Sequence, residues 1–140
     1  MIIEIKNLQT KILISPPSVK AVVRKILKKE GIAHACLSIA FVTSRKVKAI
    51  NLKYLRHNYA TDIITFDLRE HKAPKIMNGE IIISAEMAAA NAREFKVPIK
   101  KEISLCVIHG ILHLLGYDDH SPAQIKKMRA KELELMRLQT

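Results

Sequence analysis

Three of the chain's six histidines fall within twelve consecutive residues, in a segment that is apolar before its last part. His109 and His113 are four residues apart, so on a helix both imidazoles leave the same face and can bind one metal ion. A glycine three residues beyond His113 is typical of a helix end, after which the chain can turn back with a third ligand. Asp119 and His120 are the candidates for that position. The segment therefore predicts a metal site made of His109, His113 and either Asp119 or His120.

Such a site favours hydrolytic chemistry. Zinc held by three protein ligands keeps a fourth position for water, whereas a closed four-ligand site is structural. Bound zinc lowers the pKa of water towards about 7 and acts as a Lewis acid beside the scissile bond. Hydrolysis by a water activated in this way is the chemistry that the pattern predicts.

The histidine spacing matches that of the metzincin peptidases, in which a glutamate after the first histidine is the general base. Gly110 stands in that place here and has no side chain to accept a proton. Glu102, Asp118 and Asp119 are the carboxylates that could replace the missing base, and nothing in the sequence selects one. A zinc peptidase or amidase is therefore the alternative enzyme class, but the glutamate that serves such enzymes as general base is absent here.

The composition predicts a single domain, residues 1–140, with a polyanionic partner. The chain is long enough to bury a core without disulfides. Its 24 Lys and Arg against 13 Asp and Glu give a net charge of +11, which favours nucleic acid. With no Trp, three Tyr and three Phe, there are few rings on which bases can stack. We therefore expect contacts mostly to phosphates and an affinity that falls steeply with salt.

The sequence also predicts the compartment. No apolar stretch reaches the roughly 20 residues of a membrane helix, and the first residues do not resemble a signal peptide. Cys36 and Cys106 both lie in apolar runs and have no second cysteine nearby, so we expect buried free thiols rather than a zinc cluster. The expectation is a soluble cytoplasmic protein with no membrane partner.

The elements that must position the site are strands and helices in mixed order, which predicts an α+β domain with a short mixed sheet of about four strands packed by about five helices. Residues 69–78 are charged, contain a proline and are predicted to form a loop. The histidine pair falls on a long apolar helix. The predicted strands cover 2–6, 36–43, 63–68 and 79–84, and the predicted helices cover 18–30, 44–55, 85–95, 99–115 and 121–138, with Ser18, Ser44, Ser84 and Ser121 as N-caps.

With these residues in place, the chain resembles the YbeY family of bacterial endoribonucleases. The family pattern is histidine, glycine, any residue, leucine, histidine, leucine, any residue, glycine, tyrosine, aspartate, and residues 109–118 match it throughout. A second family stretch resembles the segment from Asn51 through residues 61–66, and a third resembles residues 79–84. The matches run in the family's order from about residue 50 to 120.

The sequence departs from the family at the third metal ligand. The family's third metal histidine directly follows the aspartate, and that position holds Asp119 here, with His120 one residue later. A carboxylate oxygen binds zinc as an imidazole nitrogen does, and Asp119 keeps the family's spacing after His113. His120 requires the loop to accept one extra residue, which loops tolerate. Both ligands therefore stay open.

A second departure concerns the family's arginine, which is thought to meet the substrate phosphate. Leu55 occupies its place, and Arg56 follows one residue later, so a slip of one residue near a helix end would be needed to bring Arg56 into the site. The other interpretation of Arg56 is a solvated loop charge. Thr61 and Asp62, which belong to the family's second stretch, are also residue types that favour turns.

The resemblance implies a cytoplasmic, zinc-dependent, single-strand-acting endoribonuclease with one zinc ion per chain. It implies a role in ribosomal RNA maturation, at the 3′ end of 16S rRNA, and in ribosome quality control. The partners implied are ribosomal RNA and the small ribosomal subunit, with no DNA. An alternative from another class is a ribosome-assembly factor whose metal is structural.

Overall fold

A computed structural model describes residues 1–57, 61–73 and 75–139 of the chain. Within these residues it has four strands and five helices, which confirms the predicted α+β class. The strands are β1 (Ile2–Asn7), β2 (His34–Val42), β3 (Ile63–Asp67) and β4 (Ile76–Ser84), and the helices are α1 (Pro16–Lys29), α2 (Ser44–Leu55), α3 (Ala85–Phe95), α4 (Ile99–Leu114) and α5 (Pro122–Arg137). In the part described, no helix is long and apolar enough to cross a membrane.

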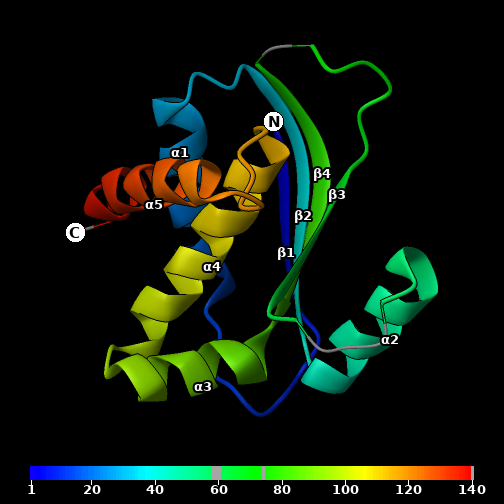
Figure 1. Ribbon diagram of the computed structural model, residues 1–140, viewed down its shortest axis with the longest axis vertical. Coiled ribbons are helices and arrows are strands. Elements are labelled where there is room, and N and C mark those ends of the chain that lie inside the picture. The colour runs from blue at the N-terminus through cyan, green and yellow to red at the C-terminus, as the bar shows by residue number, and fades with distance from the viewer. Residues whose placement is uncertain (58–60, 74, 140) are drawn as a thin grey trace.

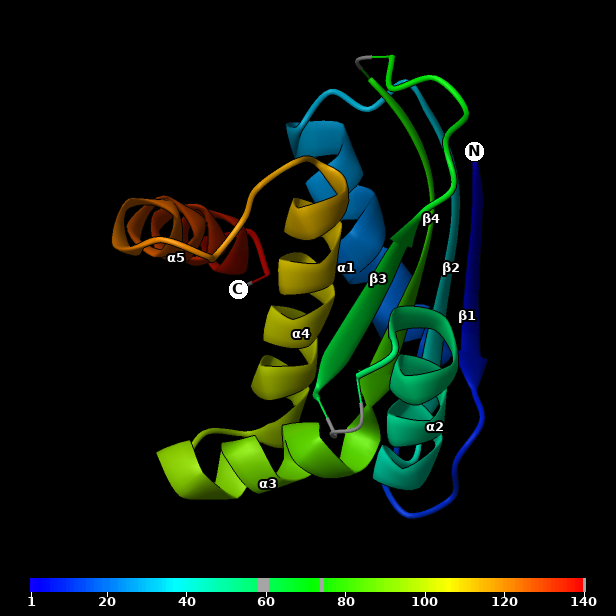
Figure 2. The same ribbon diagram turned by 45° about the vertical axis from the view of Figure 1, so that its right-hand side comes forward.

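The sheet is mixed, with strand order β1-β2-β4-β3. β1, β2 and β4 run parallel, and β3 runs antiparallel beside β4. Helices α1, α4 and α5 lie on one side of the sheet, α2 lies on the other side, and α3 runs across one end (Figures 1 and 2). The larger hydrophobic core lies beneath α1 and α4, so α4 is held between the sheet and α5.

Strand β2 shows why one cysteine prediction is wrong. Alternate residues point to opposite faces of a strand, and Leu37, Ile39 and Phe41 face the main core. Cys36 therefore points to the opposite face and is exposed, because α2 covers only the end of that face. Cys106 on α4 is buried, as predicted.

Several element ends differ from the prediction for local reasons. Helix α1 begins at Pro16 rather than after Ser18, with Ser15 as its N-cap. A proline fits the first turn of a helix because its missing N–H would have no partner there. Thr43 rather than Ser44 caps α2.

Strand β4 also begins earlier than predicted, at Ile76, inside the segment 69–78 for which the sequence predicted a loop. Ile76 aligns with His34, the first residue of β2, so parallel pairing with β2 continues to that strand's start. This pairing between distant segments is not visible in the local charge pattern.

Two glycines let α4 lie close to β4. A Cβ atom at Gly110 would be 2.8 Å from Cγ2 of the buried Ile81, and one at Gly79 would be 2.7 Å from Cδ1 of Leu114. These distances are too short for real carbon contacts. A side chain at position 110 would therefore point into the core, and there is no space for the glutamate of a peptidase.

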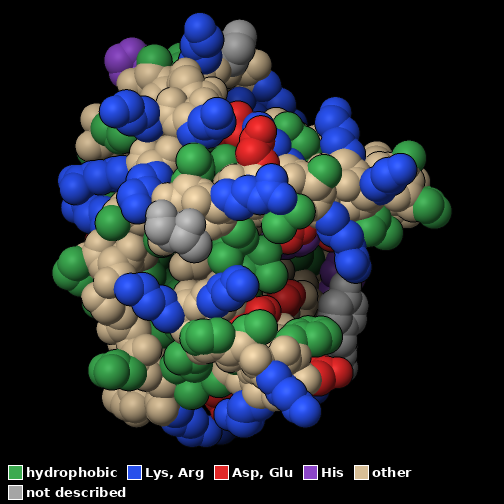
Figure 3. All heavy atoms as spheres, turned by 90° about the vertical axis from the view of Figure 1, so that its left-hand side faces the viewer, with side chains coloured by type: hydrophobic (Ala, Val, Ile, Leu, Met, Phe, Trp, Pro, Cys, Tyr) green, Lys and Arg blue, Asp and Glu red, His purple; other side chains and the backbone are tan. Residues whose placement is uncertain are grey.

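A cleft of about 1230 Å³ is lined by residues from the end of α3, from α4 and from α5. Figure 3 shows it as a hollow beneath α5, with acidic and histidine side chains inside and Lys and Arg side chains around it. Its described lining includes Asp62, Phe95, Lys100, Lys101, Glu102, Cys106, His109, Asp119, Arg129, Glu132 and Leu133.

Candidate metal centre

The end of α4 turns the chain back towards the histidine pair. Gly116 has a φ of 97°, a left-handed conformation that suits glycine. Its N–H donates to the carbonyl oxygen of His113 at 3.0 Å, and the N–H of Tyr117 donates to that of Leu112 at 3.0 Å. This pair of bonds is a Schellman motif, which ends the helix and reverses the chain.

The start of α5 fixes the other end of the same loop. Ser121 and Gln124 form the predicted capping box, in which each side chain accepts a hydrogen bond from the other residue's backbone N–H. The Gln124 side chain also accepts from the backbone N–H of His120 at 3.0 Å. The short loop that carries Asp119 is therefore anchored at both ends by hydrogen bonds that need no metal.

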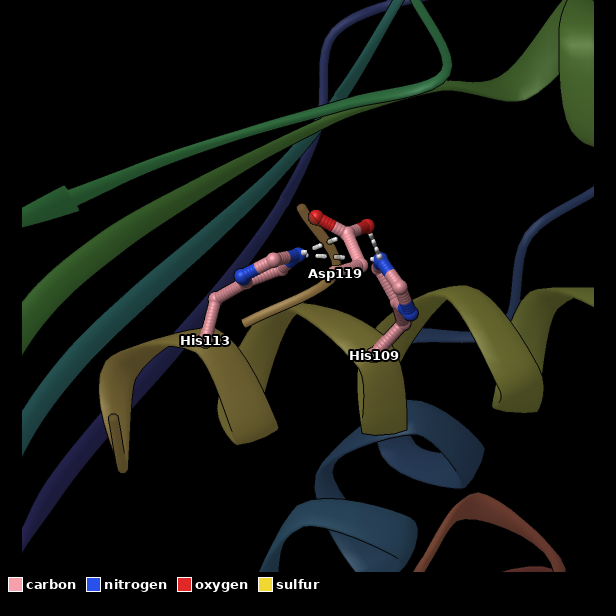
Figure 4. Close-up of side chains that lie close together, drawn as sticks. All are labelled: His109, His113 and Asp119. Carbon is pink, nitrogen blue, oxygen red and sulfur yellow. Dashed lines mark hydrogen bonds and ion pairs between the residues drawn. The ribbon is translucent and has the colours of Figure 1, made fainter. Parts of the chain in front are cut away.

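Figure 4 shows the resulting cluster of His109, His113 and Asp119. The Nε2 atoms of His109 and His113 are 3.0 Å apart. Oδ2 of Asp119 is 3.6 Å from Nε2 of His109 and 3.7 Å from Nε2 of His113. A point equidistant from the three atoms is about 2.0 Å from each, close to the roughly 2.0–2.2 Å of zinc–nitrogen and zinc–carboxylate bonds. The side chains therefore fit a zinc ion in number, chemistry and spacing.

His120 lies apart from this cluster. Its side chain is 81% exposed, and its Nε2 is 3.3 Å from Oδ1 of Asp118. Asp118, Asp119 and His120 do come together as a second group of possible ligands, but all three are exposed. Of the two candidates for the third ligand, the structure brings Asp119 to the histidine pair.

Glu132 is a residue of the site that the sequence analysis missed. Its Oε1 is 3.4 Å from Nδ1 of His109, and its side chain is only 15% exposed. Since a carboxylate only accepts, the proton is on Nδ1 of His109, and that histidine's Nε2 faces the cluster. Met128 and Leu135 flank Glu132 on α5 and are fully buried, which fixes this face of α5 against α4. In the sequence, Glu132 lies at helical spacing between Met128 and Leu135, which places it on the apolar face of α5.

The pKa values of the two histidines are shifted in opposite directions. For His109, burial disfavours the charged form, but the hydrogen bond and charge of Glu132, helped by Asp119 and Asp62, outweigh it and raise the pKa. For His113, burial and the positive charge of His109 lower the pKa. The opposite shifts disfavour a state in which both rings carry a positive charge.

Among the other predicted site residues, some line the cleft and others do not. Glu102, one of the candidate bases, lines the cleft and is buried, and its pKa is raised by burial and by the nearby charge of Asp62. Asp62 lines the same cleft. Arg56 is exposed at the end of α2 in a left-handed conformation and is not among the described residues that line the cleft. Residues 58–60 of the predicted loop 56–61 lie outside the described part of the chain.

Comparisons with known proteins agree with this fold. Residues 4–139 match the family model described as "Endoribonuclease YbeY". Proteins of that name from Syntrophus aciditrophicus and Chlorobium phaeovibrioides are each 33% identical to the chain; the matches cover 96% and 99% of this chain and 88% and 90% of those proteins. A solution structure of a Thermotoga maritima protein is similar with a TM-score of 0.69 and 29% identity, covering 99% of this chain and 89% of that one.

The fold and these matches define the class as endoribonuclease-like α+β proteins. The chain belongs to the YbeY family of endoribonucleases.

Proposed function

We propose that this protein is a zinc-dependent endoribonuclease that acts on single-stranded RNA, with residues 1–140 as its single domain. His109, His113 and Asp119 would hold one zinc ion per chain. The observation that carries the proposal is the triangle of two imidazole nitrogens and one carboxylate oxygen at zinc spacing, in a chain of an endoribonuclease family. Asp119 is preferred to His120 because its carboxylate, not the His120 ring, lies beside the pair.

A zinc ion bound here would supply an activated water and a Lewis acid for phosphodiester cleavage. The residues of the chain prepare the site for that ion. Glu132 holds the proton on Nδ1 of His109, so that Nε2 stays available as a ligand. For Arg56 we propose a contact with a substrate phosphate, which rests on the family resemblance and on its exposed side chain.

The substrate and partner that we propose are ribosomal RNA, at the 3′ end of 16S rRNA, and the small ribosomal subunit, in the cytoplasm and without DNA. Family membership and the net charge of +11 support this. A peptidase is disfavoured, because position 110 faces Ile81 in the core.

The proposal is tested by incubating the purified protein with ribosomal RNA and, separately, with casein, each with and without a zinc chelator. We expect cleavage of RNA only, abolished by the chelator and restored by added zinc. RNA cleavage that persists in the chelator contradicts zinc dependence, and cleavage of casein contradicts the choice of substrate.

Glu132 gives a prediction about the metal rather than about catalysis. Glu132→Ala is expected to weaken zinc binding by roughly 10–100-fold, the usual effect of removing a carboxylate that orients a metal-binding histidine. Glu132→Gln keeps an acceptor for Nδ1 and should weaken it less. Zinc affinity is measured by competition with a coloured chelator.

The control is Glu134→Ala, a change on the same helix at an exposed residue that pairs with Lys131 rather than with His109. Its zinc affinity should equal that of the unaltered protein. Equal affinities for Glu132→Ala and Glu134→Ala would show that Glu132 does not orient His109.

A further inference from the structure

The cleft extends well beyond the metal cluster, to an exposed aromatic ring. Phe95 is the last residue of α3, lines the cleft and is 65% exposed. Ala88 and Ala92 precede it at helical spacing and are buried, so Phe95 continues the inner face of α3 beyond the point where that face is covered. A single exposed apolar side chain is common on protein surfaces. Phe95 is distinguished by sharing a cleft with His109 and Asp119.

Basic side chains of α4 and α5 line the same cleft as this ring. Lys100 and Lys101 lie in the first turn of α4, and Arg129 lies on α5. All three are exposed, and none forms an ion pair with any residue in the described part of the chain. Unpaired cations at the rim of a cleft are suited to bind phosphates.

Two acidic side chains of the cleft, those of Glu102 and Glu132, are more buried than these cations, whereas the carboxylate of Asp119 is exposed at the proposed metal site. Glu102 is 8% exposed, and the side chain of Glu132 is 15% exposed. A phosphate at Lys100, Lys101 or Arg129 is therefore beside exposed cations, and the carboxylates of Glu102 and Glu132 lie below the surface. The apolar part of the wall, with Phe95 and the exposed Leu133, is left for the bases.

We infer that the cleft between α4 and α5 binds the stretch of single-stranded RNA next to the scissile phosphodiester, with one base stacked on Phe95 and phosphates at Lys100, Lys101 and Arg129. This inference rests on the proposed function, since it places the substrate of that same site. The volume of about 1230 Å³ exceeds the usual upper limit of about 1,000 Å³ for a small-molecule pocket, so there is space for more than one nucleotide. RNA is favoured over an apolar peptide because the rim is cationic and the cleft is continuous with the cluster.

The test measures binding of a fluorescent single-stranded 2′-O-methyl oligoribonucleotide to the zinc-loaded protein, with the oligonucleotide's integrity checked on a gel. Phe95→Ala is expected to weaken binding about tenfold, as the loss of one stacked base does, with zinc affinity unchanged. The matched control is Leu13→Ala, because Leu13 is 94% exposed and lies outside the cleft. Equal affinities for the two variants would overturn the inference.

A scan of abasic positions along the oligonucleotide sharpens the test. At one position, removal of the base should cost affinity in the unaltered protein and almost none in Phe95→Ala, which would show that the ring and the base interact directly. If the two effects are additive at every position, the ring does not stack on a base.

The phosphate-binding role of the lysines is tested by salt. Replacing Lys100 and Lys101 together with alanine should reduce the slope of log affinity against log salt by about 1.4, because each phosphate that is neutralised on a single strand contributes about 0.7. Lys28 and Lys29 are the matched adjacent pair at the end of α1, outside the cleft, and their replacement should leave the slope near its original value. Equal slopes for the two double variants contradict the inference. If the unaltered protein neither binds nor cleaves RNA, the proposed function itself fails.

Discussion

Replacing Asp119 with alanine is expected to lower zinc affinity by more than about 100-fold, because removing a direct ligand costs more than the roughly 10–100-fold of an outer-shell change. His120→Ala is expected to leave zinc affinity within about twofold of that of the unaltered protein, since the ring is not one of the three proposed ligands. The reason is geometric: Oδ2 of Asp119 lies 3.6 and 3.7 Å from the two histidine Nε2 atoms, whereas His120 is turned to solvent beside Asp118.

The measurement is a zinc titration of both variants in competition with a coloured chelator, together with the zinc content of the purified proteins. Asp119→His is a useful third variant, because it places the family's third histidine at the family's position. It should retain zinc with high affinity. The opposite result, with zinc absent from His120→Ala and kept in Asp119→Ala, would mean that the loop takes another conformation when metal is bound.

The sequence could predict the parts of this site that depend on neighbouring residues. His109 and His113 are one turn apart on any helix, so their pairing follows from spacing alone. The glycine that ends α4 and the capping box that begins α5 are also local signals, and both formed as predicted. These signals place the loop, but they do not decide which of two adjacent side chains points inward.

The parts that could not be predicted depend on packing between distant segments. Glu132 meets His109 across 23 residues, and only the packing of α5 against α4 brings them together. The exposure of Cys36 depends on how much of one sheet face α2 covers. Gly110 looked like a missing base in the sequence, and the structure gives it a packing role against Ile81.

The predicted number of strands was confirmed, because strands are recognised from neighbouring residues. A short apolar run with β-branched residues identifies a strand from its own residues. The order β1-β2-β4-β3 is set by which strands pair, and that depends on the long connections through α1 and α2. Sequence periodicity carries no information about that pairing, so only the elements and not their arrangement were predicted.

His113→Ala, like removal of zinc with a chelator, is expected to reduce RNA cleavage to the background of a buffer control and to leave the protein folded. Cleavage is abolished because the variant lacks a ligand of the proposed ion. The fold persists because α4 is held by buried apolar residues that do not touch the metal, among them Val107, Ile111 and Leu112, which are 0% exposed. The loop beyond α4 is likewise held by the Schellman motif and the capping box.

The measurements are cleavage of a ribosomal RNA fragment on a gel and thermal unfolding followed by circular dichroism. Unfolding is compared between zinc-free forms, because zinc binding to the native state alone raises the melting temperature by mass action. His120→Ala is the control and should keep both activity and zinc-dependent stabilisation. A ribosome-assembly factor with a structural metal would behave differently, since its metal-binding energy is folding energy and chelation would unfold it. Unfolding of the zinc-free protein at room temperature would therefore favour that class over a catalytic site.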